Sequence, residues 1–296
     1  MTDEKTLENT EEMDCAAEKL PAKLYLCATP IGNMGDVTRR VLDTLAAVDV
    51  IFCEDTRNSG AMLARLGIKK RLESCHEHNE EAAASRIGEL IAGGKAAAYI
   101  SDAGMPCISD PGERLVRACI ERGIGFEVLP GASASLTAAI MSGLPTKRIY
   151  FCGFLPRENR ERTELLAEIK RVRATVVIYE SPFRVGATFA ELHSVLGNRR
   201  AALVREITKL YEQAVRGTLE SLAERFGDDP PRGECVIVVS GEPEEADSAA
   251  EGLDEMLSRL LADGMSVKDA AKQAALLLDL PKSEAYRRAN ELKDAQ

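Results

Sequence analysis

Short apolar runs alternate with segments of helical period through the first half of the chain, and this alternation constrains the fold more than any other feature. The apolar runs are LYLC, VIFC, AAAYI and FEVL. Between the first two, Val37, Val41, Leu45 and Val48 recur at the three- and four-residue spacings of an amphipathic helix. Parallel strands need such crossover helices, so the pattern predicts right-handed βαβ units and a largely parallel sheet in an α/β fold.

Residues typical of helix ends indicate where these helices begin and stop. Asp36 is a suitable N-cap for the first helix, and Asn79 for a helix that Gly93 stops. Pro111 suits the first turn of a helix that ends before Gly123.

The second half follows a different pattern. ATVVIYE and GECVIVVSG read as strands, and PFRVGATFAELHSVLG reads as a helix. Residues 201–218 are strand-like in both halves with no helix between them, so part of this second sheet should be antiparallel. Three short helices follow, and Ser266 and Pro281 mark the starts of the last two. We therefore expect an acidic, disordered tail over 1–22, α/β domains over 23–146 and 147–241, a linker over 242–252, and a helix-turn-helix-like appendage over 253–296.

Length and composition indicate the number of domains, the cellular location and the state of the cysteines. A chain of 296 residues has the length of about two domains. No apolar run approaches the ~18 residues of a membrane span, and the N-terminus lacks the features of a signal peptide, so we expect a cytoplasmic protein. The eight cysteines form no C-x-x-C pair and several lie in apolar runs, which indicates reduced, buried thiols.

Negative charge is concentrated at the two ends of the chain. Of the net −10, residues 1–22 contribute −5 (seven acids, two lysines) and residues 242–296 contribute −6 (thirteen acids, seven bases). Residues 23–241 therefore stand at +1, and a basic face on this body is compatible with a nucleic-acid partner. The segment 157–173 carries six bases and four acids, which fits either an RNA contact or a solvated helix face.

Polar loops rich in glycine and proline follow four of the predicted strands. They are TPIGN, CEDTR, SDAGMPCISDPG and PGASAS. Ligands of open α/β sheets bind outside the carboxyl ends of the strands, where small residues let a ligand approach the backbone. Neither G-x-x-x-x-G-K-[ST] nor G-x-G-x-x-G occurs at these loops, so the sequence favours a small ligand other than a nucleoside triphosphate or a dinucleotide.

Eight motifs, in order, resemble those of one family. TPIGN, EDTR, HEHNE, SDAGMPCISDPG, PGASA, GFLPR, ESPFR and REITKLYEQ span residues 29–213. This series resembles the RsmI family of small-subunit ribosomal RNA methyltransferases, which has the tetrapyrrole-methylase fold of two α/β domains. The resemblance implies S-adenosyl-L-methionine as cofactor, methylation of a cytidine ribose 2′-oxygen in 16S rRNA within the small ribosomal subunit, and a homodimer. It does not account for the acidic tail.

The resemblance also implies which residues contact the cofactor: Pro30, Ser101, Asp102, Ala103, Gly104, Met105, Ser133, Ala134 and Tyr179. Among them, Asp102 is the expected anion near the positive charge or polar end of the cofactor. The second aspartate of the repeated Ser-Asp pair, Asp110, is expected to cap the helix that begins at Pro111.

A ribose hydroxyl is a poor nucleophile until its proton leaves, so charged residues near the loops are candidates for assistance. We expect Glu54, Asp55, Arg57 and Lys209 to act in catalysis, with Glu180 and Glu206 as further candidates. Each of these also has a structural interpretation, such as a helix cap for Asp55 or an ion pair for Glu180. The CHEH segment, residues 75–78, has no second cluster to complete a metal site, and we expect no metal.

Two other functions stay open at this point. The chain could methylate a small tetrapyrrole on the same fold, or it could bind RNA without catalysis. Aromatic content of 4% supplies a base-stacking surface poorly. For RNA contacts on the body we expect the arginines Arg57, Arg157, Arg160, Arg162 and Arg184.

Overall fold

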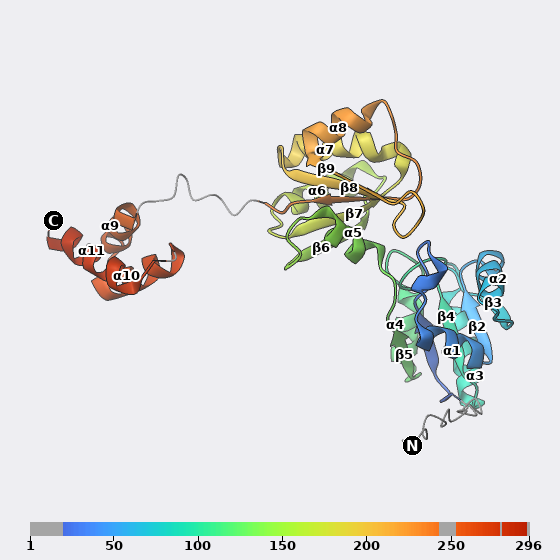
Figure 1. The fold of residues 1–296 in the computed structure, drawn as a ribbon. Helices are drawn as coiled ribbons and strands as arrows, with labels where there is room; N and C mark the ends of the chain where they lie inside the picture. The colour runs from blue at the N-terminus through green and yellow to red at the C-terminus, as the bar shows by residue number, and fades with distance from the viewer. Residues whose placement is uncertain (1–19, 243–252, 279, 295–296) are drawn as a thin grey trace, which may run out of the picture. The chain divides into compact units, whose positions relative to one another are not determined.

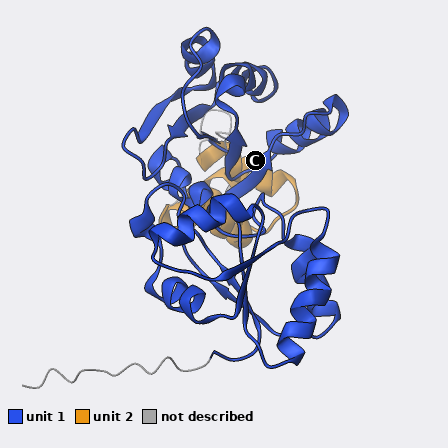
Figure 2. Cartoon of the chain, turned by 90° about the vertical axis from the view of Figure 1, so that its right-hand side faces the viewer, with its two compact units in different colours: residues 1–241 blue, residues 242–296 orange. Residues whose placement is uncertain are grey.

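The computed structural model describes residues 20–242, 253–278 and 280–294. The chain divides into two compact units, residues 1–241 and 242–296 (Figure 2). Most of the expected acidic tail (1–19) and of the expected linker (243–252) lie outside the described residues.

The first sheet of the larger unit is parallel throughout, as the alternating pattern predicted. Its strands stand in the order β3-β2-β4-β1-β5 (Figure 1). The strands are β1 (Leu24–Cys27), β2 (Val50–Cys53), β3 (Arg71–Ser74), β4 (Ala97–Ile100) and β5 (Phe126–Leu129). The helices of this half are α1 (Arg39–Ala47), α2 (Thr56–Arg65), α3 (Glu80–Ala92), α4 (Glu113–Glu121) and α5 (Ala134–Ser142), with a 3₁₀ turn at Met34–Asp36.

Alternate residues of these strands enter two separate cores. Leu24, Phe52 and Tyr99 belong to one core, with α3 and α4, whereas Tyr25 and Ile51 belong to the other, with α1. Strands that are buried on both faces read as continuous apolar runs, which is why the sequence showed no polar alternation there.

The second sheet is mixed, with the order β6-β7-β10-β8-β9. β6 (Ile149–Phe154) and β7 (Thr175–Glu180) are parallel, whereas β8 (Arg200–Arg205), β9 (Gln213–Thr218) and β10 (Cys235–Val239) join by antiparallel pairings. The antiparallel hairpin over 200–218 confirms the prediction for that segment. Its helices are α6 (Asn159–Lys170), α7 (Val185–Leu196) and α8 (Leu219–Gly227), with a 3₁₀ turn at Pro182–Arg184.

Helix α5 joins the two halves. Its Ala138 and Ala139 are fully buried against Val177, Val204 and Val238 of the second sheet. The opposite face of that sheet packs against α6, α7 and α8. Because α5 follows directly from the last strand of the first sheet, this packing brings the loops of the first sheet toward the second sheet.

Two predicted helix starts were wrong. Asp36 ends a 3₁₀ turn, and the first helix is capped by Thr38, whose hydroxyl accepts from the Val41 amide. α4 begins at Glu113 after Gly112, whose φ of 123° lets the chain turn there, so Asp110 does not cap it. The prediction that this helix ends before Gly123 was confirmed, since α4 ends at Glu121 and Gly123 has a φ of 66°.

The smaller unit contains the three predicted helices, α9 (Leu253–Ala262), α10 (Val267–Leu277) and α11 (Lys282–Asp294). The Ser266 hydroxyl accepts from the Asp269 amide and caps α10, as predicted. Alanines of α10 and α11 allow close approach of the helices, and Arg288 pairs with Asp254 across α11 and α9. No helix in the described ranges is long and apolar enough to span a membrane. The seven described cysteines are free thiols and are buried or half-buried, as expected.

Candidate functional site

The loops that follow β1, β2, β4 and β5 meet at one edge of the first sheet. The backbones of Thr29 and Gly104 exchange hydrogen bonds of 2.9 and 3.0 Å. The Asn58 amide donates to the Asp102 carboxylate at 2.8 Å, which joins the start of α2 to the loop after β4. A Cβ on Gly131 would lie 2.6 Å from Ala28 Cβ, so the loop after β5 packs directly on the end of β1. The four polar loops therefore form one surface, as predicted.

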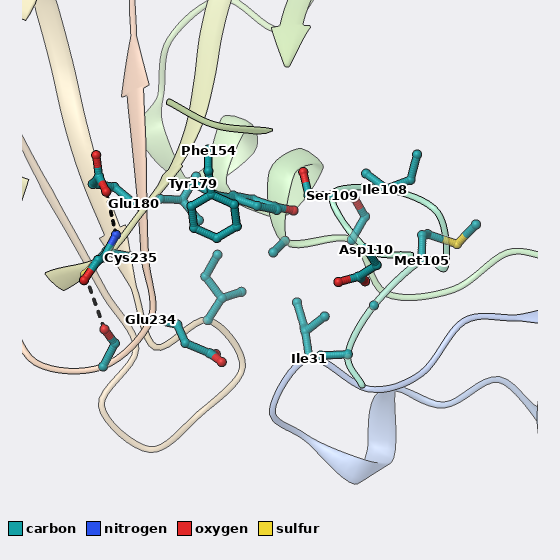
Figure 3. Close-up of a pocket in the computed structure, with 18 of the residues that line it drawn as sticks. Ile31, Met105, Ile108, Ser109, Asp110, Phe154, Tyr179, Glu180, Glu234 and Cys235 are labelled. Carbon is teal, nitrogen blue, oxygen red and sulfur yellow. Dashed lines mark hydrogen bonds between the residues drawn. The ribbon is translucent and has the colours of Figure 1, made fainter. Parts of the chain in front are cut away.

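A cavity of about 440 Å³ lies between these loops and the second sheet. Residues from the first half on one side are Ile31, Met105, Ile108, Ser109 and Asp110, and residues from the second half facing them are Phe154, Tyr179, Glu180, Glu234 and Cys235 (Figure 3). This volume is in the usual range for a small-molecule site.

Six of the nine expected cofactor residues line the cavity: Ala103, Gly104, Met105, Ser133, Ala134 and Tyr179. The other three support the loops or lie beside them. Pro30 precedes the lining residue Ile31, and Ser101 is fully buried and accepts at its carbonyl from the Thr29 hydroxyl at 3.2 Å. Asp102 is exposed and bonded to Asn58 outside the lining.

Three carboxylates border the cavity, those of Asp110, Glu180 and Glu234, and the pKa of Asp110 is raised. Burial, with repulsion from Glu54 and Asp102, raises the pKa of Asp110 to about 6, although a hydrogen bond from Ser101 opposes the shift. Asp110 was missed as a site residue because its position before a proline and a glycine looked like a helix cap.

Glu180 is the second carboxylate, and it is 3% exposed. It accepts from the Thr188 hydroxyl at 2.7 Å and from the Ser181 amide at 2.8 Å, and it lies 3.5 Å from Arg184 Nε. These contacts offset the cost of burying the charge and fix the end of β7. The third carboxylate, Glu234, is exposed and accepts from Lys209 Nζ at 2.8 Å.

Aromatic rings form one wall. Tyr179 packs edge-to-face against Phe151 at 4.9 Å and Phe154 at 5.6 Å between ring centroids. Burial raises the pKa of the Tyr179 phenol, so it is a neutral hydrogen-bonding group at neutral pH. This wall offers a flat apolar surface to a ligand with an aromatic ring.

Of the residues expected to assist catalysis, Glu180 lines the cavity, whereas Glu54, Asp55, Arg57, Glu206 and Lys209 do not. Asp55 caps α2 through the Arg57 amide and also pairs with the Arg57 guanidinium at 2.9 Å, which lowers the Asp55 pKa to about 2. Burial raises the pKa of Glu54. Lys209 lies between Glu206 and the cavity residue Glu234, with contacts of 2.9 and 2.8 Å.

Most of the arginines expected to contact RNA already have an acidic partner. The pairs are Arg57–Asp55, Arg160–Glu164, Arg162–Glu191 and Arg184–Glu180. Arg157 is exposed. Since an intramolecular partner competes with phosphate, these positions have less free positive charge than their number suggests.

Backbone strain marks the two loops that face each other. Cys107 and Ser109 have φ of 70° and 60°, and Glu206 and Thr208 have φ of 50° and 66°. Residues without glycine's freedom hold such angles only where their surroundings impose them, often at functional sites. No sequence pattern indicates these angles. Within the described residues, no group of three or more His, Cys, Asp or Glu side chains could hold a metal ion.

Comparison with known proteins gives two family matches. Residues 23–223 match the model of the Tetrapyrrole (Corrin/Porphyrin) Methylases, and residues 245–293 match that of the RsmI C-terminal HTH domain. The chain is 42% identical over 285 residues to the Ribosomal RNA small subunit methyltransferase I of Mesorhizobium japonicum, covering 96% of both chains. It is 42% identical over 268 residues to the protein of the same name from Halalkalibacterium halodurans, covering 89% of this chain and 93% of that one.

Solved structures share the fold at lower identity. Uroporphyrin-III-C-methyltransferase from Thermus thermophilus aligns with a TM-score of 0.54 at 22% identity, over 74% of this chain and 94% of that one. Diphthine synthase aligns with a TM-score of 0.59 at 15% identity, over 74% and 89%.

Proposed function

This chain belongs to the family of tetrapyrrole (corrin/porphyrin) methylases, and from that premise we propose that it methylates ribosomal RNA of the small subunit with S-adenosyl-L-methionine as the methyl donor. The single observation that carries the proposal is near-full-length identity of 42% to relatives named Ribosomal RNA small subunit methyltransferase I. The uroporphyrin-III-C-methyltransferase of Thermus thermophilus is more distant, at 22% identity. A tetrapyrrole acceptor is therefore the weaker alternative.

The cavity residues fit this donor. Its aromatic wall at Phe154 and Tyr179 suits an adenine ring, and the carboxylates of Asp110, Glu180 and Glu234 favour a positively charged ligand. When bound, the cofactor supplies a methyl group on a positively charged sulfur. The lining includes no lysine, histidine or arginine, and burial raises the pKa of its one thiol, Cys235, to about 11, which keeps that thiol protonated and weakly nucleophilic.

We further propose the acceptor as a cytidine ribose 2′-oxygen, as the motif resemblance implies. The bound cofactor would supply the methyl group for an in-line displacement by this oxygen, and a carboxylate of this chain would accept the hydroxyl proton. Asp110 lines the cavity and its carboxylate is desolvated, which suits both balancing the sulfonium charge and accepting a proton. Glu54, Asp55, Arg57 and Lys209 are proposed to orient the acceptor from the rim, and Pro30, Ser101 and Asp102 to support the cofactor loop.

The domain division, the assembly and the location are parts of the same proposal. We propose that residues 23–146 and 147–241 are two domains that share the cofactor cavity, that the protein is a cytoplasmic homodimer, and that residues 253–296 contact the ribosomal subunit. Exposed apolar side chains on α5, Leu136 and Ile140, are available to a partner surface.

Methyl mapping tests the proposal. Small-subunit RNA from cells with and without this protein is compared for 2′-O-methyl groups, and purified protein is then incubated with labelled cofactor and either small subunits or porphyrin precursors. We expect one cytidine to lose its methyl group without the protein and labelled RNA in vitro. Label in porphyrin alone would select the tetrapyrrole alternative.

A further inference from the structure

A second cavity, of about 610 Å³, adjoins the first on the surface of the second half. It is formed by the end of β8, the β8–β9 loop, the end of α8 and the segment that leads into β10. We call it the arginine groove, and its lining residues are Arg205, Glu206, Tyr211, Gln213, Arg225, Phe226, Asp229, Pro230, Pro231, Arg232 and Gly233. Gly233 lines both cavities, so a ligand in the groove lies next to the proposed cofactor site.

None of the three groove arginines pairs with a carboxylate in the described part of the chain. Arg205 donates to the Gln213 side chain at 3.0 Å and to the Arg232 carbonyl at 2.9 Å, both neutral acceptors. The Arg225 guanidinium lies 5.5 Å from the Phe226 ring centroid, and Arg232 is exposed. This contrasts with Arg57, Arg160, Arg162 and Arg184, whose charges are balanced within the protein.

The acids of the groove do not cancel this charge. The Glu206 carboxylate accepts from Lys209 Nζ at 2.9 Å and from the Glu234 amide at 3.1 Å. The Lys209 hydrogen bond lowers the Glu206 pKa, so Glu206 is ionised and already paired. Asp229 is the other acid in the lining. The three arginines of the lining exceed its two acids, Glu206 and Asp229, by one charge, which leaves the groove positive in a protein whose net charge is −10.

The groove also offers a surface for stacking. The Tyr211 side chain is 69% exposed, although a tyrosine is usually at least half-buried in a folded protein. It sits in the loop whose backbone is strained at Glu206 and Thr208. Exposed aromatic rings beside arginines are the usual components of a single-strand nucleic-acid site, where bases stack and phosphates bind guanidinium groups.

We infer that the arginine groove binds the single-stranded RNA segment next to the methylated nucleotide, with backbone phosphates on Arg205, Arg225 and Arg232 and a base on Tyr211. The choice of RNA rests on the proposed function. Gly233, which lines both cavities, has no room for a side chain, because a Cβ there would lie 2.2 Å from Glu206 Oε1 and would displace the Glu206–Lys209 pair.

The test measures RNA binding and methyl transfer separately. The variants are the double substitution Arg225→Gln/Arg232→Gln and the single substitution Tyr211→Ala. A matched control, Arg39→Gln/Arg117→Gln, removes the same charge from exposed ion pairs on α1 and α4. Binding of a single-stranded oligonucleotide from small-subunit RNA is titrated at several salt concentrations, with cofactor affinity and thermal unfolding measured on each variant.

We expect the double variant to bind RNA about tenfold or more weakly, and its salt slope to fall by about 1.4, since each single-strand phosphate contact contributes about 0.7. Tyr211→Ala should weaken binding with the salt slope unchanged, because stacking releases no counterions. Cofactor affinity and folding should match wild type, and KM for RNA should rise more than kcat falls.

Two results would overturn the inference. One is RNA binding by the double variant equal to that of the Arg39/Arg117 control. The other is competition by polyglutamate as effective as by RNA of equal charge, which would make the groove a site for an acidic protein segment. If wild type binds RNA through the groove but transfers no methyl group, the proposed function fails, whereas the assignment of the groove as an RNA-binding surface stands.

Discussion

Thr29 and Gly104 hold each other through two backbone hydrogen bonds, of 2.9 and 3.0 Å, although they belong to loops that follow different strands. These two hydrogen bonds fix the loop after β4 to the loop after β1, and each loop contributes a residue to the cavity lining, Gly104 and Ile31. Gly104 has a φ of 80°, and a Cβ at this position would lie 3.2 Å from Ile31 Cγ2, inside the cavity lining.

The first prediction concerns Gly104→Val. A β-branched residue at this φ costs about 1–2 kcal/mol of unfolding free energy and pushes Ile31 into the cavity. We expect cofactor affinity to fall about tenfold or more, measured by calorimetry. Gly123→Val is the control, because Gly123 has a similar φ of 66° with open space around its Cβ position. Equal losses of cofactor affinity in both variants would assign the effect to general destabilisation.

The second prediction concerns the pH dependence set by Asp110. Its pKa is about 6 in the folded protein and about 3.9 in an unfolded chain. A bound cation favours the ionised carboxylate, so affinity for S-adenosyl-L-methionine should rise as pH increases from 5 to 7. In Asp110→Asn this rise should vanish. The control is Asp36→Asn, which removes an exposed carboxylate from the same half; its cofactor affinity should change with pH as that of wild type does. A pH-dependent affinity that survives in Asp110→Asn would exclude this carboxylate as its source.

The same pKa predicts a change of stability with pH. Between about pH 4 and pH 6 the folded state binds more protons at Asp110 than the unfolded state does, so this group's contribution to the free energy of unfolding falls as pH rises. Denaturant unfolding of wild type and Asp110→Asn across this window should show a steeper fall for wild type. Parallel curves would contradict the raised pKa.

The third prediction separates the two aspartates of the repeated Ser-Asp pair. Asp102 contacts Asn58 and is exposed, whereas Asp110 lines the cavity. Asp102→Ala should therefore weaken cofactor binding only by a few-fold, through the loop, and Asp110→Ala should weaken it by more than about tenfold. Calorimetric titration of both variants checks the order, and a larger loss for Asp102→Ala would place the cofactor charge near Asp102 instead.

The fourth prediction concerns the hydroxyl that supports Glu180. Thr188→Val removes the 2.7 Å hydrogen bond to a carboxylate that is 3% exposed, and should lower the free energy of unfolding by about 1.5–3 kcal/mol. Thr163→Val is the matched control, because the Thr163 hydroxyl donates only to the carbonyl of Asn159 on an exposed helix face. Urea unfolding measures both, and equal small losses would mean that water replaces the Thr188 contact.

The fifth prediction concerns the acidic N-terminus. Deletion of residues 1–19 removes seven acids and two lysines, a charge of −5, while keeping Leu20, which packs on the core. RNA affinity should be unchanged or stronger, with the difference largest at low salt. Weaker binding after the deletion would show that the tail itself contacts RNA or a ribosomal protein.

The sequence predicted the alternating strands and helices well because burial on both faces of a parallel sheet leaves an unmistakable apolar run. It also predicted that the loops after β1, β2, β4 and β5 would lie together, since strands that neighbour in the sheet bring their carboxyl ends together. Side chains that depend on the second sheet were mostly missed. Glu234 and Phe154 line the cavity from the second half of the chain, and no local sequence pattern indicates that these residues face the loops of the first sheet.

Helix caps and ion pairs show the other limit of prediction from sequence. Asp36 and Thr38 are both good caps, and only the backbone path selects Thr38. In the sequence, four arginines look equally available to bind phosphate: Arg57, Arg160, Arg162 and Arg184. In the structure each of them forms an ion pair with a carboxylate. Residue type therefore identifies candidate caps and candidate phosphate ligands, and only the folded structure shows which of them have another partner.

The cavity wall runs from Ile31 to Val236, nearly the full length of the larger unit. During synthesis, the first sheet can form while the second is still being translated, but its loops then have no opposite wall. A nascent chain stalled before β10 should fold the first half and retain no cofactor. We therefore expect cofactor binding to begin only once residues 233–236 have been translated, because they complete the wall of the cavity.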